Sequence, residues 1–117
     1  MSTLGAGGMG VVFEAVHVDT EAHVAIKWLS PELSSTPEAT ERFKIEARAT
    51  GRIRHPNVVA IHDIGEHQGN VFMVMELLRG MSLRARLMQG NLDLPAALKI
   101  LFPVMRGVAA AHAVKVL

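Results

Sequence analysis

The stretch Leu4-Gly5-Ala6-Gly7-Gly8-Met9-Gly10-Val11-Val12, followed later in the chain by Val24-Ala25-Ile26-Lys27, decides the fold. Its glycines at positions 5, 7 and 10 form a G-x-G-x-x-G pattern, and a β-branched run at 11–18 follows them directly. Because glycine lacks a Cβ, backbone N–H groups at such positions can approach phosphate oxygens closely. The stretch therefore predicts a glycine-rich turn that can lie over phosphates.

The glycine pattern alone leaves three interpretations open: a flexible turn, a dinucleotide site and a phosphate-covering hairpin. A dinucleotide site needs a buried strand before the glycines and a helix after them. Here only Met1 to Leu4 precede the cluster, and the pattern that follows is typical of a strand. This order counts against a nicotinamide-dinucleotide enzyme.

The rest of the chain predicts hairpins of strands beside a few helices, which indicates an α+β fold. Thr36-Pro37 is typical of a helix start, and His55-Pro56 of the segment that closes that helix. We expect Pro103 to kink the last helix. The predicted strands are 11–18, 22–29, 58–64 and 71–78, with a polar loop at 65–70, and the later helices are 82–89 and 95–114.

Strand alternation places Ala25 and Lys27 on one face, away from the side chains of residues 24, 26 and 28. Glu46 shares a predicted helical stripe with Ala39, Phe43, Thr50 and Ile53. A carboxylate on an apolar face is unusual unless it is paired, so we expect Glu46 to pair with Lys27. The alternatives are an exposed strand-end Lys27 and a surface Glu46 that pairs with Arg42.

Together these motifs resemble a bacterial eukaryotic-like Ser/Thr protein kinase, because Val24-Ala25-Ile26-Lys27 matches the V-A-I-K strand that follows the kinase glycine loop. The resemblance covers nearly the whole chain. Its further segments are Arg42-Phe43-x-x-Glu46-Ala47, His55-Pro56-Asn57-Val58-Val59, Phe72 to Leu78, Gly80-Met81-Ser82-Leu83 and Arg106 to Ala113.

The resemblance implies a kinase-like N-lobe at residues 1–79, an antiparallel twisted sheet with one helix, and the first helices of a C-lobe at 80–117. It implies that Val12 and Ala25 sandwich adenine, that Lys27 contacts the α- and β-phosphates of ATP, and that Glu46 holds Lys27. Met75 would be the gatekeeper, and the backbones of Glu76 and Leu78 would bind the adenine edge. The full implied nucleotide-binding set is Leu4, Gly5, Ala6, Gly7, Gly8, Met9, Gly10, Val11, Val12, Ala25, Lys27, Met75, Glu76 and Leu78.

The chain departs from the family at both ends. Only Met1-Ser2-Thr3 precede Leu4, so we expect most of the first strand to be missing and the glycine loop to be poorly anchored on one side. After Val116-Leu117 the family continues into H-R-D-x-K-x-x-N, and Lys115 replaces a glycine common before that loop. The catalytic Asp and the ligands of the expected Mg²⁺ have no counterpart, so we expect these 117 residues alone to be inactive.

Composition limits the other function classes. A formal charge of +1 and scattered arginines give no basic tract for nucleic acid, and without cysteine there is no disulfide or thiolate chemistry. The histidines have no recognised metal-ligand spacing. No segment is typical of a secretory signal, and Ile100 to Leu117 is interrupted by Arg106, His112 and Lys115, so we expect a cytoplasmic protein without a membrane segment.

The last predicted helix carries apolar side chains whose usual partners, in the family, lie in the rest of the C-lobe. These side chains are Leu98, Ile100, Leu101, Phe102, Val104 and Val108. We expect this surface to associate with other protein. The sequence thus predicts the ATP-binding portion of a Ser/Thr kinase that phosphorylates protein hydroxyls, and the alternative is a non-catalytic ATP-binding or kinase-interacting regulatory module.

Overall fold

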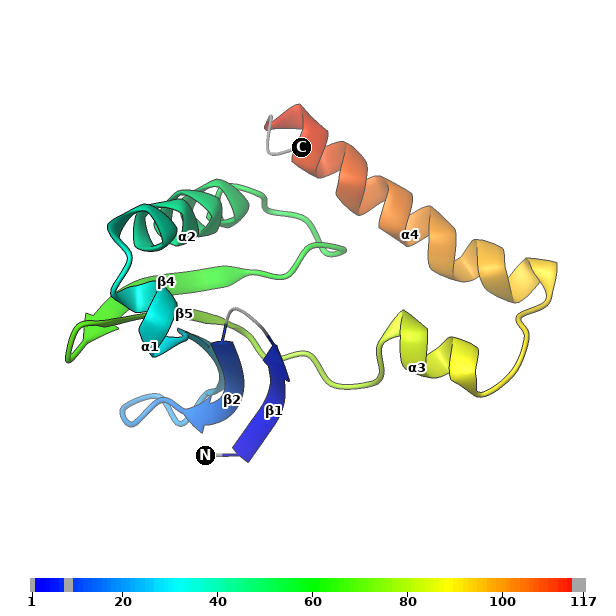
Figure 1. The fold of residues 1–117 in the computed structure, drawn as a ribbon. Coiled ribbons are helices and arrows are strands. Elements are labelled where there is room, and N and C mark those ends of the chain that lie inside the picture. The colour runs from blue at the N-terminus through cyan, green and yellow to red at the C-terminus, as the bar shows by residue number, and fades with distance from the viewer. Residues whose placement is uncertain (1, 8–9, 115–117) are drawn as a thin grey trace.

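The computed structural model describes residues 2–7 and 10–114. Its centre is a five-stranded antiparallel sheet with the strand order β1-β2-β3-β5-β4. Figure 1 shows the sheet on one side of the molecule, with a helix over one of its faces and two further helices beyond it. The strands are β1 (Ser2–Gly7), β2 (Gly10–Val16), β3 (His23–Leu29), β4 (Ile61–His67) and β5 (Asn70–Glu76).

Within residues 2–7 and 10–114, four helices accompany the sheet, and local sequence marks where they begin. They are α1 (Pro31–Ser34), α2 (Pro37–Gly51), α3 (Leu83–Met88) and α4 (Leu94–Ala113). Proline occupies the first turn of α2, where no backbone N–H is needed. Ser82 Oγ accepts a hydrogen bond from Ala85 N at 3.0 Å, and Asp93 Oδ1 accepts one from Ala96 N at 2.8 Å. These side chains cap α3 and α4. Pro103, where the sequence predicted a kink, lies inside α4, and the helix runs without a break from Leu94 to Ala113.

The first strand is present, contrary to the expectation that most of it would be missing. β1 pairs with β2 from Ser2 opposite Glu14 to Gly7 opposite Gly10, with one irregularity between Thr3 and Gly5. Even the few residues before Leu4 therefore form ladder pairs. Gly5, Gly7 and Gly10 lie in these two paired strands.

The hairpin of β4 and β5 is tighter than predicted. Both strands extend into the expected polar loop, and they are joined at Gln68 and Gly69, whose φ angles are 53° and 80°. Two successive positive φ values are typical of the type I′ turn that matches the twist of paired strands. β4 also starts later than predicted, at Ile61, because residues 55–58 form a turn in which Val58 N donates to His55 O at 3.1 Å.

The core lies between the sheet and α2. It consists of the buried side chains of Leu29, Phe43, Ala47, Val71 and Met73. Phe43 and Ala47 are one turn apart, so they face the sheet together. Glu46 lines a cavity together with Phe43 and Thr50 of the predicted stripe, but its side chain is exposed, so the stripe is not buried along its whole length.

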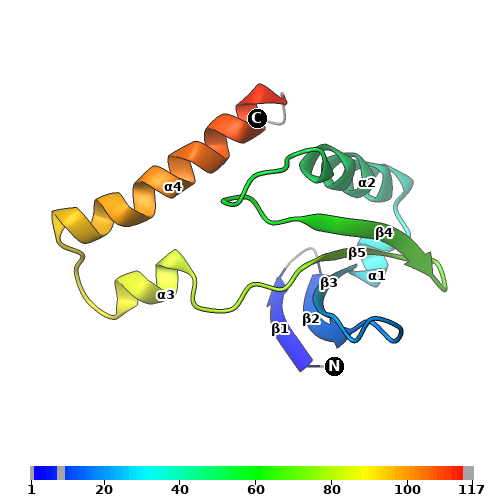
Figure 2. The same cartoon turned by 180° about the vertical axis from the view of Figure 1, so that it is seen from behind.

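Helix α4 contacts the rest of the described residues through small side chains. Gly107 and Ala111 are its buried residues, and a Cβ added at Gly107 would lie 2.8 Å from Asn57 O. Glycine therefore allows α4 to approach the segment between α2 and β4 closely. Figure 2 shows α4 leading back from α3 toward the end of α2.

Most of the apolar surface of α4 is exposed, as the sequence predicted. Leu101, Phe102 and Val104 are each about half exposed. Among residues 2–7 and 10–114, α4 is the one helix long and apolar enough to cross a membrane by length and composition. Core helices of soluble proteins meet the same criterion, so this is weak evidence for a membrane span.

Candidate functional site

One face of the sheet gathers the side chains that the sequence singled out. Val12 lies opposite Lys27 in the β2–β3 pair, and Lys27 lies opposite Met73 in the β3–β5 pair. Ala25 lies opposite Met75. Directly opposite residues in an antiparallel pair project to the same face, so these five side chains share one surface. It is the face that α2 covers, because Met73 belongs to the core beneath that helix.

Gly10 anchors the glycine turn against β3. Its φ angle is 153°, and a Cβ built there would lie 1.8 Å from the backbone oxygen of Trp28. No side chain fits at that distance, so glycine is required for β2 to pair with β3 at this end. Gly5 pairs with Val12 and Gly7 with Gly10 across the turn, whereas Gly8 and Met9 lie outside the described residues.

A cavity of about 400 Å³ lies between the sheet face and α2. Lys27 reaches it from β3 and Glu46 from α2, which brings the two predicted partners to the same space. The cavity is otherwise mostly apolar, with Val12, Phe43, Ala47, Thr50, Val59, Ile61, Met73 and Met75 in its wall.

The predicted ion pair between Lys27 and Glu46 is not formed in this structure. Within residues 2–7 and 10–114, the pairs closer than 4.0 Å join Glu14 to His23, Glu14 to Arg79, and Lys44 to Glu66. The alternative pair of Glu46 with Arg42 is not formed either. Glu46 lies exposed at the rim of the cavity that it shares with Lys27.

The end of β5 provides backbone groups beside this cavity. Glu76 N donates to Ala60 O at 2.8 Å, and Ala60 N donates to Glu76 Oε2 at 3.1 Å. The backbone N–H of Glu76 is therefore already bonded, so a ligand edge can use only its carbonyl. Leu78, two residues later, is exposed outside the sheet.

Sequence reasoning missed two parts of this region. Ala47 lines the cavity one turn after Phe43, a spacing that the sequence contained. The carboxylate of Glu14 on β2 lies 3.1 Å from His23 Nδ1 on β3 and 3.7 Å from an Arg79 guanidinium nitrogen after β5. No motif signals this cluster, because its members are far apart in sequence.

The site suits a nucleotide better than a metal ion. The glycine turn, the Lys27 cation and an apolar wall match phosphates attached to a flat base. The residues that the structure describes bring together no group of three or more His, Cys, Asp or Glu side chains that could hold a metal.

Comparisons with known proteins agree with this geometry. The protein kinase domain family model matches residues 1–117. The chain is 44% identical over 111 residues to the serine/threonine-protein kinase PknH of Mycobacterium tuberculosis, covering 94% of this chain and 18% of that protein. It is 42% identical over 116 residues to PknA of the same species, covering 94% and 27%. It thus spans less than a third of the length of these relatives.

The fold has close solved counterparts. The crystal structure of the PknI kinase domain of M. tuberculosis superposes with a TM-score of 0.81 at 27% identity. The match covers 97% of this chain and 46% of that one. The chain is therefore a member of the protein kinase domain family, its relatives are Ser/Thr protein kinases, and its fold is a kinase N-lobe followed by helices of the C-lobe.

Proposed function

We propose that this chain binds ATP as the nucleotide-binding portion of a Ser/Thr protein kinase, and that the whole protein transfers the γ-phosphoryl group to protein hydroxyls. The observation that carries the proposal is the register that sets Lys27 opposite Val12 on one sheet face, next to the glycine turn. The boundary between the lobes at residue 79 and a cytoplasmic location stay predictions. So does the absence of a membrane segment.

In this proposal the adenine ring lies against Val12 and Ala25, below the glycine turn. Ala25 is 4% exposed, and its small side chain suits close contact with a flat ring. The carbonyl of Glu76 is the hydrogen-bond acceptor for the exocyclic amine of adenine, because the N–H of the same residue is bonded to Ala60. The backbone of Leu78 would provide the second contact.

Lys27 is the cation for the α- and β-phosphates. A fixed positive charge at this position stabilises the charge that shifts toward the leaving phosphates in the transition state. Glu46 is the positioning residue. It lines the same cavity, and an approach of α2 to β3 would bring its carboxylate toward Lys27. Mg²⁺ would supply further charge neutralisation in this family, and the 117 residues contain no H-R-D or D-F-G sequence whose side chains would hold it.

The experiment compares two lysine substitutions in the full-length protein, with phosphoryl transfer from ATP to protein as the readout. Lys27→Met should lower kcat/KM by about a hundredfold or more, the usual cost of removing one transition-state charge contact. Lys99→Met is the matched control, since Lys99 is exposed on α4 and remote from the sheet. Equal losses in both variants would contradict the proposed role of Lys27.

A binding measurement separates this proposal from a dinucleotide enzyme and from a regulatory module. Calorimetry should detect ATP binding and no NAD binding. ATP binding without phosphoryl transfer by the full-length protein would favour the non-catalytic module instead.

We also propose that the chain associates with other protein through α4. The exposed apolar side chains of this helix support it, because surfaces of this kind seldom face water in a monomer. Sedimentation of the 117-residue polypeptide should show concentration-dependent association that Leu101→Glu weakens. A monomer at all concentrations would contradict this part.

A further inference from the structure

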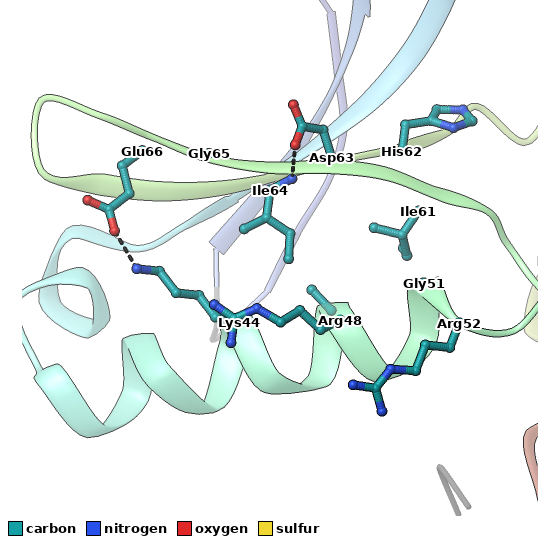
Figure 3. A pocket seen from close by; sticks show the side chains of 11 residues that line it. Lys44, Arg48, Gly51, Arg52, Ile61, His62, Asp63, Ile64, Gly65 and Glu66 are labelled. Carbon is teal, nitrogen blue, oxygen red and sulfur yellow. Dashed lines mark hydrogen bonds and ion pairs between the residues drawn. The ribbon is translucent and has the colours of Figure 1, made fainter. Parts of the chain in front are cut away.

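A second and larger cavity, of about 770 Å³, lies between α2 and β4, and we call it the α2–β4 groove (Figure 3). It shares Ala47 and Ile61 with the Lys27 cavity, but none of its charged residues. β4 is the outermost strand on this side of the sheet, so no strand among the described residues covers it. The proposed nucleotide site uses no charged residue of this groove.

The helical wall of the groove carries a row of cations. Lys44 and Arg48 on α2, and Arg52 directly after its last turn, are four residues apart, so they follow one another along one side at steps of about 6 Å. Figure 3 shows the three side chains following one another along the helix. The Lys44 ammonium donates a hydrogen bond to Glu66 Oε1 on β4. Arg48 and Arg52 have no ion pair within 4.0 Å inside residues 2–7 and 10–114.

The acidic residues of β4 do not balance these two arginines. Glu66 is already bonded to Lys44. The Asp63 carboxylate accepts the backbone N–H of Ile64 at 2.8 Å, and Figure 3 shows it on the side of the strand away from α2. The helical wall thus keeps a net positive charge beside Arg48 and Arg52.

The strand wall is apolar where it faces the helix. Ile61 and Ile64 are half-buried, and Figure 3 shows both side chains pointing from β4 toward α2. The groove therefore has one cationic wall and one apolar wall. A ligand that fits it presents negative charge on one side and an apolar group on the other.

We propose that the α2–β4 groove binds an extended acidic peptide segment of another protein. In an extended chain, alternate side chains lie about 6.6 Å apart on one side, and the residue between them points to the opposite side. Two carboxylates at alternate positions match the spacing of about 6 Å between Arg48 and Arg52. The intervening apolar side chain then contacts Ile61 and Ile64. A guanidinium fork binds a carboxylate with two parallel hydrogen bonds, which selects this anion by shape as well as charge.

The test measures the fluorescence anisotropy of a labelled peptide with the core Glu-Ile-Glu, titrated with the full-length protein. The comparison peptide has the core Gln-Ile-Gln, which keeps the shape and removes the charge. We expect the acidic peptide to bind at least about tenfold more tightly, as two exposed but bidentate ion pairs allow. Its affinity should fall as salt is raised, because the pairs are open to solvent.

Substitutions in the groove test whether the peptide binds there. Arg48→Glu with Arg52→Glu should abolish the preference for the acidic peptide, and Arg48→Gln with Arg52→Gln should reduce it without reversing the charge. Arg84→Glu on α3 reverses one positive charge outside the groove and should leave binding unaltered. Circular dichroism establishes that each variant is folded.

Several results would overturn the proposal. These are equal affinity for the two peptides, no binding of either, and a loss in Arg84→Glu as large as in the double variant. Displacement of the peptide by equimolar inorganic phosphate or oligothymidylate would show a general anion site instead. Self-association that the Arg48→Glu and Arg52→Glu changes abolish would assign the groove to a second copy of this chain.

Discussion

Gly10 offers a sharp test of the sheet geometry that supports the nucleotide site. In the substitution Gly10→Ala, the new Cβ would lie 1.8 Å from Trp28 O, whereas real Cβ contacts essentially never fall below 3.0 Å. β2 and β3 would have to separate there by more than about 1 Å, since both clashing groups are held by backbone pairing. Rotation of a side chain cannot relieve this contact.

The expected cost follows from two contributions. A left-handed φ at a non-glycine residue costs about 1–3 kcal/mol. Loss of the ladder hydrogen bond at the end of the β2–β3 pair costs about 1 kcal/mol more. We therefore expect Gly10→Ala to lower the free energy of unfolding by about 2–4 kcal/mol.

Urea unfolding followed by the emission of Trp28, the one tryptophan of the chain, measures this change close to its origin. Two glycines serve as controls. A Cβ at Gly5 meets nothing within 4 Å, so Gly5→Ala should change stability little. Gly69 has a φ of 80° and open space, so Gly69→Ala should show the conformational cost without the clash. A loss in Gly10→Ala no larger than that in Gly69→Ala would refute the reasoning.

Three further predictions concern the core, the α4 contact and the cavity. Leu29→Ala should lower the free energy of unfolding by about 2–5 kcal/mol, because Leu29 is fully buried. Leu94→Ala, at an exposed leucine, should change it by less than about 0.5 kcal/mol. Similar losses in urea titrations of the two variants would contradict the assigned core. Gly107→Val should cost about 1–3 kcal/mol in the same titration, because its Cβ would press on Asn57 O; unchanged stability would exclude that close approach. Glu46→Gln should lower kcat of the full-length kinase while leaving the KM for ATP within about threefold, as expected for a positioning residue; an unchanged kcat would remove Glu46 from the site.

Local patterns were enough to predict much of the sheet and helices. The V-A-I-K strand became β3 with only a small change of boundary, because its alternation and β-branched residues act locally. The start of α2 at Thr36-Pro37 also lies where the sequence placed it, and α3 begins one residue after the predicted start at residue 82. In each case neighbouring residues provide the whole signal.

The errors arose where pairing partners decide the structure. Glu66 and His67 look like loop residues, but they continue β4 because Val71 and Asn70 pair with them. β1 forms from few residues because it pairs with β2 along its whole length. A short helix, α1, was missed although Ser30 and Pro31 signal its start, since Ser30 Oγ accepts a weak hydrogen bond from Leu33 N at 3.4 Å.

The candidate site could be predicted in its parts but not in its geometry. The motifs identified Lys27 and Glu46, and the structure brings both to one cavity. The charged groups of Lys27 and Glu46 lie more than 4.0 Å apart because of the position of α2 on the sheet. The packing of Phe43 and Ala47 in the core determines that position. The cationic wall of the α2–β4 groove likewise follows from helix placement, although the four-residue spacing of its side chains was visible in the sequence.

The most direct test of the proposed function is a crystal structure of the full-length protein with a non-hydrolysable ATP analogue. We expect Lys27 Nζ within about 3 Å of an α- or β-phosphate oxygen, and the adenine between Val12 and Ala25 with its amine donating to the carbonyl of Glu76. A nucleotide bound elsewhere, or bound with Lys27 turned away from its phosphates, would contradict the assignment of this sheet face as the ATP site.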